Sequence, residues 1–230
     1  MMSKPTLQAE PKQMVQQTAY SVLYAISFAH LLNDMLQAVI PAIYPIIKED
    51  FHLDFTDIGL VTLTYQLTAS ILQPFVGLYT DRHPKPFSLA IGMGISLMGL
   101  VSLALSPSFF WILASVGLIG IGSSIFHPDS SRVAYLASGG KRGLAQSIFQ
   151  LGGNAGSALG PLLAALLVVS YGQRSVMGFG VAALIGIILL TRIGKWYKTV
   201  ALPKVNKTVE SASSGLSQRR VLLSLLILLV

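Results

Sequence analysis

The 230-residue sequence contains no cysteine and few charged side chains. Without cysteine the protein has no disulfide bridge, thiolate metal ligand or cysteine nucleophile. Charged residues make up 11 % of the chain, whereas a typical soluble domain carries roughly 25 %. Also absent are a phosphate-binding glycine loop, a zinc-ligand spacing and a serine triad. We therefore expect neither an enzyme nor a bound cofactor or metal ion.

Hydrophobic residues, by contrast, make up 53 % of the sequence, and the mean hydropathy is +0.66. The charges are clustered, and long apolar stretches lie between the clusters. This pattern is typical of an all-α, polytopic membrane protein embedded in a lipid bilayer. The net charge of +7 arises from basic residues in the breaks between apolar stretches, so we expect no binding to nucleic acid.

Six apolar stretches are long enough to cross a bilayer, which takes about 20 residues of helix. The predicted spans cover residues 20–47, 57–80, 86–106, 109–134, 142–170 and 176–197. Residues 1–19 are predicted as a polar tail, residues 198–218 as a cytoplasmic linker, and residues 219–230 as the start of a seventh span. We expect this six-helix half to be joined to a second, C-terminal six-helix half.

The connections between the spans differ in charge. Of the sixteen lysines and arginines, only Lys48 and Arg174 fall in the first, third and fifth connections. The same connections hold four acidic residues, namely Glu49, Asp50, Asp54 and Asp57. Because basic residues mark the cytoplasmic side of a membrane protein, both ends of this six-span unit are predicted to be cytoplasmic.

The first span carries four polar residues on one helical face, spaced by three and four: His30, Asn33, Asp34 and Gln37. A charge at the centre of a bilayer costs about 2.5–3.5 kcal/mol on insertion scales. Asp34 must therefore be paired, hydrated or protonated there, which suits a site that loads and releases protons. The other interpretation is that Asp34 only bonds neighbouring helices.

Further polar residues share helical faces in the other spans. The candidates for the same cavity are Gln66 and Gln73 in the second span, His127 in the fourth, and Gln146, Gln150 and Asn154 in the fifth. Bonding between helices is an equally open interpretation of the two glutamines in the second span. Pro74 directly after them predicts a kink.

The fifth span also contains glycines at intervals of four, Gly152, Gly156 and Gly160, and Pro161 follows the last of them. This doubled GxxxG pattern predicts a tight contact between helix backbones at the cavity wall.

The connection after the second span reads GLYTDRHPKP and resembles the signature loop of the major facilitator superfamily. Gly77, Asp81, Arg82 and Lys85 fit that loop, whereas Pro84 and Pro86 depart from it. The resemblance implies a six-helix half built from two inverted three-helix repeats, in which this loop latches the halves together on the cytoplasmic side. The glycine is expected to allow close helix approach, and Arg132 is the expected partner of Asp81.

Two further motifs of that family are recognisable in part. The glycine run of the fifth span resembles the family's antiporter motif, although its final paired glycines are replaced. The arginine that the family carries in the middle of the fourth span is Val116 here. The resemblance therefore moves the expected proton carrier to Asp34, with His30 or His127 assisting.

At a finer level the chain resembles the fosmidomycin resistance subfamily of these transporters, on the strings at 30–35, 126–134 and 143–150. The resemblance implies a bacterial inner-membrane exporter that exchanges protons for a drug or phosphonate-like molecule. His127 and Arg132 are then the expected cationic contacts of an anionic substrate. The alternatives are a symporter or uniporter of a small metabolite on the same scaffold, and a membrane protein that transports nothing.

Overall fold

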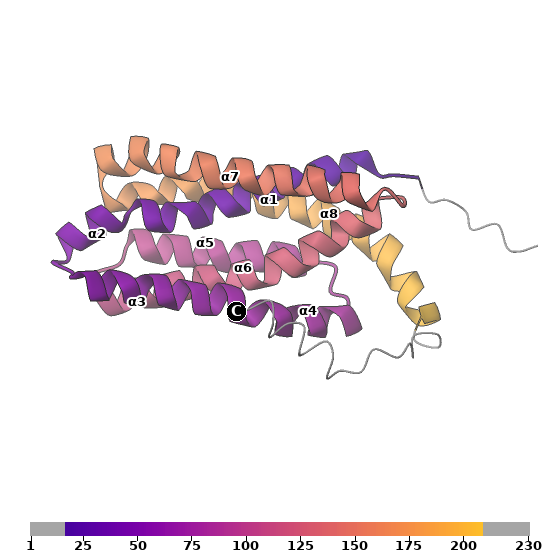
Figure 1. Cartoon of the computed structure of the whole chain (residues 1–230), viewed down its shortest axis with the longest axis horizontal. Helices are drawn as coiled ribbons and strands as arrows, with labels where there is room; N and C mark the ends of the chain where they lie inside the picture. Colours follow the sequence, from indigo (N-terminus) through magenta and orange to yellow (C-terminus); the bar gives the residue numbers. More distant parts are fainter. Residues whose placement is uncertain (1–16, 209–230) are drawn as a thin grey trace, which may run out of the picture.

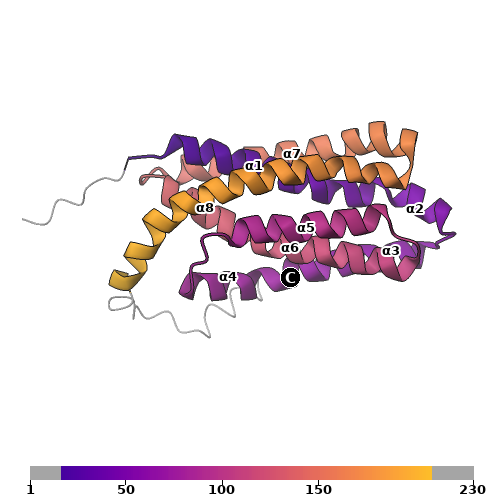
Figure 2. The same cartoon turned by 180° about the vertical axis from the view of Figure 1, so that it is seen from behind.

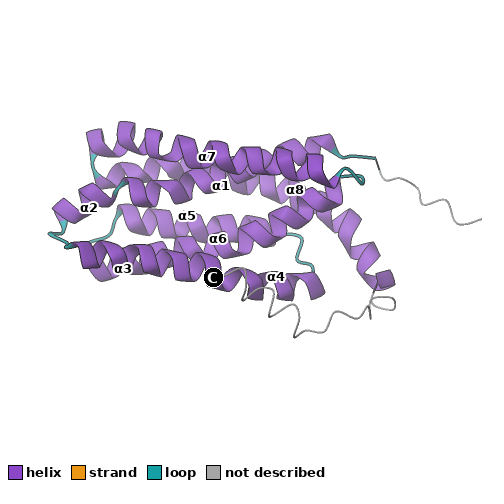
Figure 3. Cartoon of the chain, viewed as in Figure 1, coloured by secondary structure: helices purple, strands orange, loops and turns teal. Residues whose placement is uncertain are grey.

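The computed structural model describes residues 17–208, with side chains as far as residue 200. Every regular element in that range is helical (Figure 3). In chain order these are α1 (Tyr20–Ala42), α2 (Tyr44–Asp50), α3 (Phe55–Gln66), η1 (Leu67–Ile71), α4 (Leu72–Arg82), α5 (Ser88–Ala104), α6 (Phe109–Ala137), α7 (Arg142–Tyr171), η2 (Gln173–Phe179) and α8 (Gly180–Thr208). The predicted all-α class is confirmed.

The six predicted spans correspond to six helical rods. The first rod is α1 with α2, interrupted at Ile43 between Pro41 and Pro45, and the second consists of α3, η1 and α4. The others are α5, α6, α7, and η2 with α8. Within the described residues, α1, α6, α7 and the last rod are long and apolar enough to cross a membrane, while α5 is a shorter apolar helix.

The last rod extends further than predicted. Helix α8 continues to Thr208, whereas the predicted span ends at residue 197 and a linker was expected from residue 198. The remainder of that linker, the predicted seventh span and most of the N-terminal tail lie outside the described residues.

The rods run side by side along the long axis of the molecule (Figures 1 and 2). The α2–α3, α5–α6 and α7–η2 connections lie at one end, and the N-terminal segment and the α4–α5 and α6–α7 connections lie at the other (Figure 1). At the first end Asp54 and Asp57 form a reciprocal capping box that starts α3. The charge asymmetry of the sequence therefore coincides with the two ends of the bundle.

The first three rods and the last three rods form two three-helix groups. The closest packing is between helices of different groups. Helix α1 packs mainly along α7, and α6 packs along α3, η1 and α4 as well as along α5 (Figure 1). The first helix of each three-helix group thus lies against the second helix of the other group. Two inverted three-helix repeats give this arrangement, in which the first helices, α1 and α6, also meet each other.

Glycines account for the close approach of α7 to α1. A Cβ atom on Gly152 would lie 1.9 Å from the carbonyl oxygen of Ser27, and one on Gly156 would lie 2.2 Å from that of Leu31. Gly160 repeats the contact one turn further on. Both helices advance by four residues from one contact to the next, so the stripe predicted from the sequence lies along the backbone of α1.

The second rod contains a π-helical turn, η1, directly before Pro74. Proline has no N–H, so the carbonyl of Ser70 lacks its helical partner there, and a widened turn relieves the clash with the ring. Opposite η1, a Cβ on Gly120 of α6 would lie 2.0 Å from the Thr68 hydroxyl oxygen. The absence of a side chain at Gly120 lets the widened turn press against α6.

Large apolar side chains on the outer faces of the rods are more than half exposed, including Phe75, Leu162, Val169 and Ile188. Water does not favour apolar patches of this extent, whereas lipid chains do, and helices satisfy their backbone hydrogen bonds internally. The exposed faces are those of a multi-pass membrane protein.

Candidate functional site

The centre of the polar cluster is a histidine–aspartate pair on α1. The Nε2 atom of His30 lies 3.2 Å from Oδ2 of Asp34, four residues on. The side chain of His30 is 3 % exposed and that of Asp34 is 16 % exposed. The amide of Asn33 donates a hydrogen bond of 3.1 Å to the other carboxylate oxygen of Asp34. Three of the four polar residues predicted on this face are therefore in contact.

Helix α7 determines which nitrogen of a neutral His30 ring carries the proton. Its Nδ1 atom lies 2.9 Å from the carbonyl oxygen of Phe149, and the imidazole stacks on the Phe149 ring at 4.0 Å between centroids. A carbonyl oxygen only accepts hydrogen bonds, so Nδ1 carries the proton. In the neutral ring Nε2 then has a lone pair, and it faces a carboxylate oxygen that is also an acceptor. A proton or another cation between the two atoms makes this contact favourable.

Gly153 of α7 leaves the space that the pair occupies. A Cβ atom at this position would lie 2.4 Å from Cε1 of His30 and 2.9 Å from Oδ2 of Asp34. Any side chain at residue 153 would therefore displace the pair.

Helix α6 adds His127 to the cluster. Its Nε2 atom lies 3.8 Å from Oδ1 of Asp34, and its ring meets the edge of the His30 ring at 5.4 Å between centroids. The carboxylate of Asp34 is thus flanked by two imidazoles from two helices. The three residues that the sequence predicted for proton coupling lie together.

Gln37 forms a second polar layer, one turn along α1. Its Oε1 atom accepts a hydrogen bond of 2.5 Å from the Tyr65 hydroxyl and one of 3.1 Å from Ser123. Its Nε2 atom is buried and has no partner among the described residues. Gln37 therefore joins α1 to α3 and α6, and the N–H groups of its amide remain free to donate hydrogen bonds.

A cavity of about 290 Å³ opens beside this layer. It is lined by Asp34, Gln37, Ala38, Pro41, Tyr44, Thr62, Tyr65, Gln66 and Ser157. Of the two glutamines predicted in the second span, Gln66 lines the cavity and Gln73 does not.

The polar residues predicted on the fifth span form an exposed stripe on α7. Gln146, Gln150 and Asn154 are exposed, and Gln150 donates a hydrogen bond of 3.2 Å to Asn154. Ser157, three residues after Asn154 and on the same helical face, lines the cavity. The stripe runs up to the cavity, but among the described residues it makes no hydrogen bond to the His30–Asp34 pair.

A second charged cluster lies near the C-terminal end of α6, where Arg132 follows His127 by five residues. Arg132 forms an ion pair with Asp81 of α4, the partner expected from the sequence, and a second with Asp129 at 3.2 Å. It also donates a hydrogen bond of 2.9 Å to the backbone oxygen of Thr80. Asp129 accepts a further hydrogen bond from Ser88 of α5. Arg132 and Asp129 together tie the second, third and fourth rods to one another.

A sequence model of the Major Facilitator Superfamily matches residues 26–230. This chain belongs to the major facilitator superfamily. The match covers the helices that carry both clusters, and it places the chain among membrane transporters rather than enzymes.

Two relatives from this superfamily are 48 % identical to the chain. One is the fosmidomycin resistance protein of Escherichia coli, over 99 % of this chain and 56 % of the relative. The other is the uncharacterized transporter YfnC of Bacillus subtilis, over 78 % of this chain and 44 % of the relative. Protein spinster homolog 1 of Xenopus tropicalis is 25 % identical over 75 % of this chain and 34 % of its own length. The chain thus spans about half the length of the curated relatives it matches.

Two positions of the superfamily pattern can be compared with their surroundings in this chain. Val116, at the position of the mid-membrane arginine, is fully buried among apolar side chains, so no charge lies there. A Cβ on Gly77 would lie 3.5 Å from Cβ of Pro128, an ordinary van der Waals distance. A methyl group at Gly77 would fit among the described residues, and the expectation that this glycine allows close helix approach stays a prediction.

Several residues of the two clusters were not predicted from the sequence. Asp129 and Ser88 lack a local pattern that links them, although Asp129 and Arg132 are three apart on one helix. Tyr65 sits next to the predicted Gln66 and was not itself singled out from the sequence. The role of the Phe149 carbonyl cannot be predicted from side-chain types, because it depends on where α7 packs against α1.

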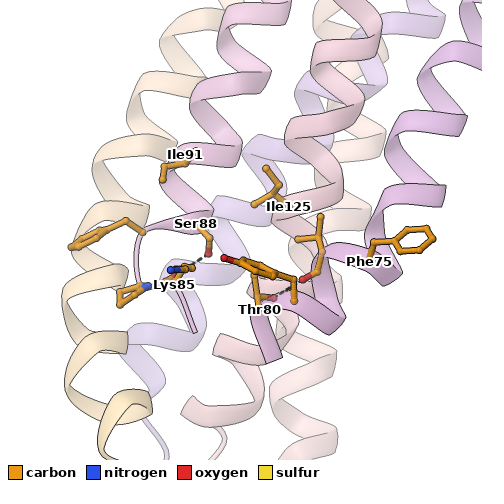
Figure 4. Close-up of a pocket in the computed structure, with 10 residues that line it drawn as sticks. Phe75, Thr80, Lys85, Ser88, Ile91 and Ile125 are labelled. Atoms are coloured by element: carbon orange, nitrogen blue, oxygen red, sulfur yellow. Dashed lines mark hydrogen bonds between the residues drawn. The ribbon is translucent and has the colours of Figure 1, made fainter. Parts of the chain in front are cut away.

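Another groove lies beside Thr80 and Ser88, which contact the Arg132 cluster (Figure 4). It has a volume of about 600 Å³ and is lined mainly by apolar residues, among them Phe75, Ile91 and Ile125. Lys85, from the signature loop, lies at its edge. The lining offers little polar chemistry, so we place the candidate site at the His30–Asp34–His127 cluster.

The Arg132 cluster leads to a stability prediction in which burial decides the outcome. The side chain of Asp129 is 6 % exposed and that of Asp81 is 64 % exposed. Breaking a buried pair costs about 3–5 kcal/mol, whereas an exposed pair contributes about 0–1 kcal/mol. We expect Arg132→Met to lower the melting temperature of the purified protein strongly and Asp81→Asn to leave it nearly unchanged. Equal losses of melting temperature in the two variants would show that the exposed Arg132–Asp81 pair, and not the buried one, stabilises the protein.

Proposed function

We propose that this chain forms the N-terminal half of a proton-coupled antiporter, which exports a small organic molecule across a bacterial inner membrane. The observation that carries the proposal is the facing pair of His30 Nε2 and Asp34 Oδ2, 3.2 Å apart, at the wall of a cavity inside a membrane-embedded bundle. Two acceptors at hydrogen-bonding distance are favourable when a proton lies between them.

Coupling follows from the change in charge at this pair. When the proton leaves, the cluster gains one negative charge in surroundings of low dielectric constant, where electrostatic interactions are strong. A substrate in the adjoining cavity meets a different field in each state, so its affinity depends on proton occupancy. By reciprocity the proton's affinity depends on the substrate, and this mutual dependence drives exchange.

The substrate class is proposed from the relative at 48 % identity, which is named for resistance to fosmidomycin, a phosphonate antibiotic. Of the two cations expected to contact an anionic substrate, His127 lies in the cluster at Asp34. Arg132 is held by Asp81 and Asp129 instead. The free donor of Gln37 adds a neutral contact for a phosphonate oxygen.

The orientation is proposed from the charges of the connections. The end of the bundle that carries the N-terminal segment and the signature loop holds Arg82, Lys85, Lys141 and Arg142, which favours a cytoplasmic location. The opposite end, with Asp54 and Asp57, would then face the periplasm. Export, rather than import, is supported by the likeness of the α7 glycine run to the antiporter motif.

Everted membrane vesicles from cells that express the gene would test the direction of coupling. Respiration acidifies the lumen of such vesicles, and we expect added fosmidomycin to release lumenal protons, seen as recovery of quenched acridine-dye fluorescence. Vesicles from cells with an empty vector are the control. A uniporter would give no recovery, and a symporter would not release protons with this polarity, so either result would reject the antiport mechanism.

A further inference from the structure

Apart from proton binding, the geometry of the same cluster points to a second ligand: we propose that His30, Asp34 and His127 form a binding site for one divalent transition-metal ion of the zinc type. One ligand atom from each residue lies within 4.8 Å of the other two. The proposal goes beyond the proposed function, because it concerns equilibrium binding and holds whether or not the chain exchanges protons.

The distances between the ligand atoms are also close to those of a metal site. With metal–ligand bonds of about 2.1 Å, two ligand atoms of a tetrahedral site lie about 3.4 Å apart. The Nε2 atom of His30 lies 3.2 Å from Oδ2 of Asp34, and that of His127 lies 3.8 Å from Oδ1, the other oxygen of the same carboxylate. The second is too long for a hydrogen bond, and closing it requires a small movement of the His127 ring, whose side chain is 26 % exposed.

The protonation of His30 also suits a metal ligand. Its Nδ1–H donates to the carbonyl oxygen of Phe149, so Nε2 keeps its lone pair and points toward the carboxylate. Histidine ligands of metals are held in this way by a hydrogen bond from the second ring nitrogen. Stacking on Phe149 and the hydrogen bond from Asn33 to Asp34 fix the orientations of two of the three ligands before any ion binds.

The ligand types select the metal. Two imidazole nitrogens and one carboxylate oxygen suit zinc, cobalt, nickel and ferrous iron, whereas magnesium and calcium prefer sets of oxygen ligands. Three protein ligands leave one coordination position open. Asp34 also lines the 290 Å³ cavity, so a water molecule or an oxygen of an anionic solute in that cavity can take the open position.

This site has no signature in the sequence, which explains why no metal was expected. His30 and Asp34 have the i, i+4 spacing of many helical contacts, and the third ligand comes from α6, on the other three-helix group. The absence of a side chain at Gly153 completes the site, because a Cβ there would lie within 3 Å of His30 Nε2 and Asp34 Oδ2.

The test is a titration of the purified, untagged protein with Zn²⁺, followed by calorimetry and by competition with a zinc-sensitive dye. We expect one equivalent to bind, with no competition from Mg²⁺. The variants His30→Gln, Asp34→Asn and His127→Gln should each weaken binding by at least about tenfold, the effect that even outer-shell changes have at metal sites. His52→Gln and His83→Gln, which alter the two histidines outside the cluster, are the matched controls.

Affinity that is unchanged in His127→Gln, or lost in either control variant, would overturn the proposal. A measurement on the unaltered protein guards against misfolded variants: Co²⁺ should give the intense visible absorption of a four- or five-coordinate site, and Zn²⁺ should raise the melting temperature. Absence of both effects would also overturn it. These readouts need no energised membrane, so their failure leaves the antiport proposal standing, and failure of antiport leaves the metal site standing.

Discussion

Asp34→Asn is expected to abolish proton release from everted vesicles on drug addition and to reduce fosmidomycin resistance to the level of cells with an empty vector. Asparagine keeps the size of the side chain and a hydrogen-bonding partner for His30, but it does not bind and release a proton. The helix should still insert, because an amide costs less than a carboxylate inside the bilayer. The amount of protein in the membrane, measured on the same vesicles, should therefore match that of the unaltered protein.

Asp50→Asn is the matched control, since Asp50 is exposed at the end of α2 and the same chemical change there should alter neither readout. Resistance that persists in Asp34→Asn would reject Asp34 as the proton carrier. If proton release persisted while resistance was lost, Asp34 would be a substrate contact instead.

The second large effect is expected from Gly156→Ala, a change of one methyl group at the α1–α7 contact. The new Cβ would lie 2.2 Å from the carbonyl oxygen of Leu31, and a backbone atom cannot rotate away. Helix α1 must move, which costs about 1–3 kcal/mol or more by analogy with overpacked cores. The movement also shifts His30 and Asp34, which flank Leu31 on α1. We expect a lower melting temperature together with loss of transport.

Gly143→Ala on the same helix is the control, because nothing lies within 4 Å of a Cβ at that position. Replacing glycine by alanine inside a helix generally stabilises it by about 0.5–1 kcal/mol, so this variant should melt at the same temperature or slightly higher. Equal melting temperatures for the two variants would mean that α1 and α7 are not packed backbone to backbone.

The sequence was sufficient for features that repeat along one helix. Hydropathy was enough to predict the rods. The four-residue spacing of Gly152, Gly156 and Gly160 was enough to predict the contact face of α7, because that face depends only on helical periodicity. The polar face of α1 was predictable for the same reason. What it touches was only partly predictable, since the partners of Asp34 and Gln37 come from α6 and α3.

The missed features depend on how far apart two helices lie. Gly153 has no periodic partner, yet it makes room for the His30–Asp34 pair, whereas Gly77 belongs to a known motif and has space for a methyl group. The π turn at η1 packs at Thr68 against Gly120 of α6, and no local pattern reveals that these two residues meet. Asp129 is buried where α6 packs against α5, and Ser88 of α5 donates a hydrogen bond to it.

The crossed pairing of α1 with α7 has a consequence for biosynthesis. His30 and the Phe149 carbonyl that orients it are 119 residues apart in the chain, and ribosomes add roughly 5–20 residues per second. Helix α1 therefore leaves the ribosome about 6–24 s before its partner exists. For most of that interval Asp34 has no imidazole of His127 beside it, and α7 is not yet there to pack against α1. Water or the insertion machinery must therefore surround the carboxylate.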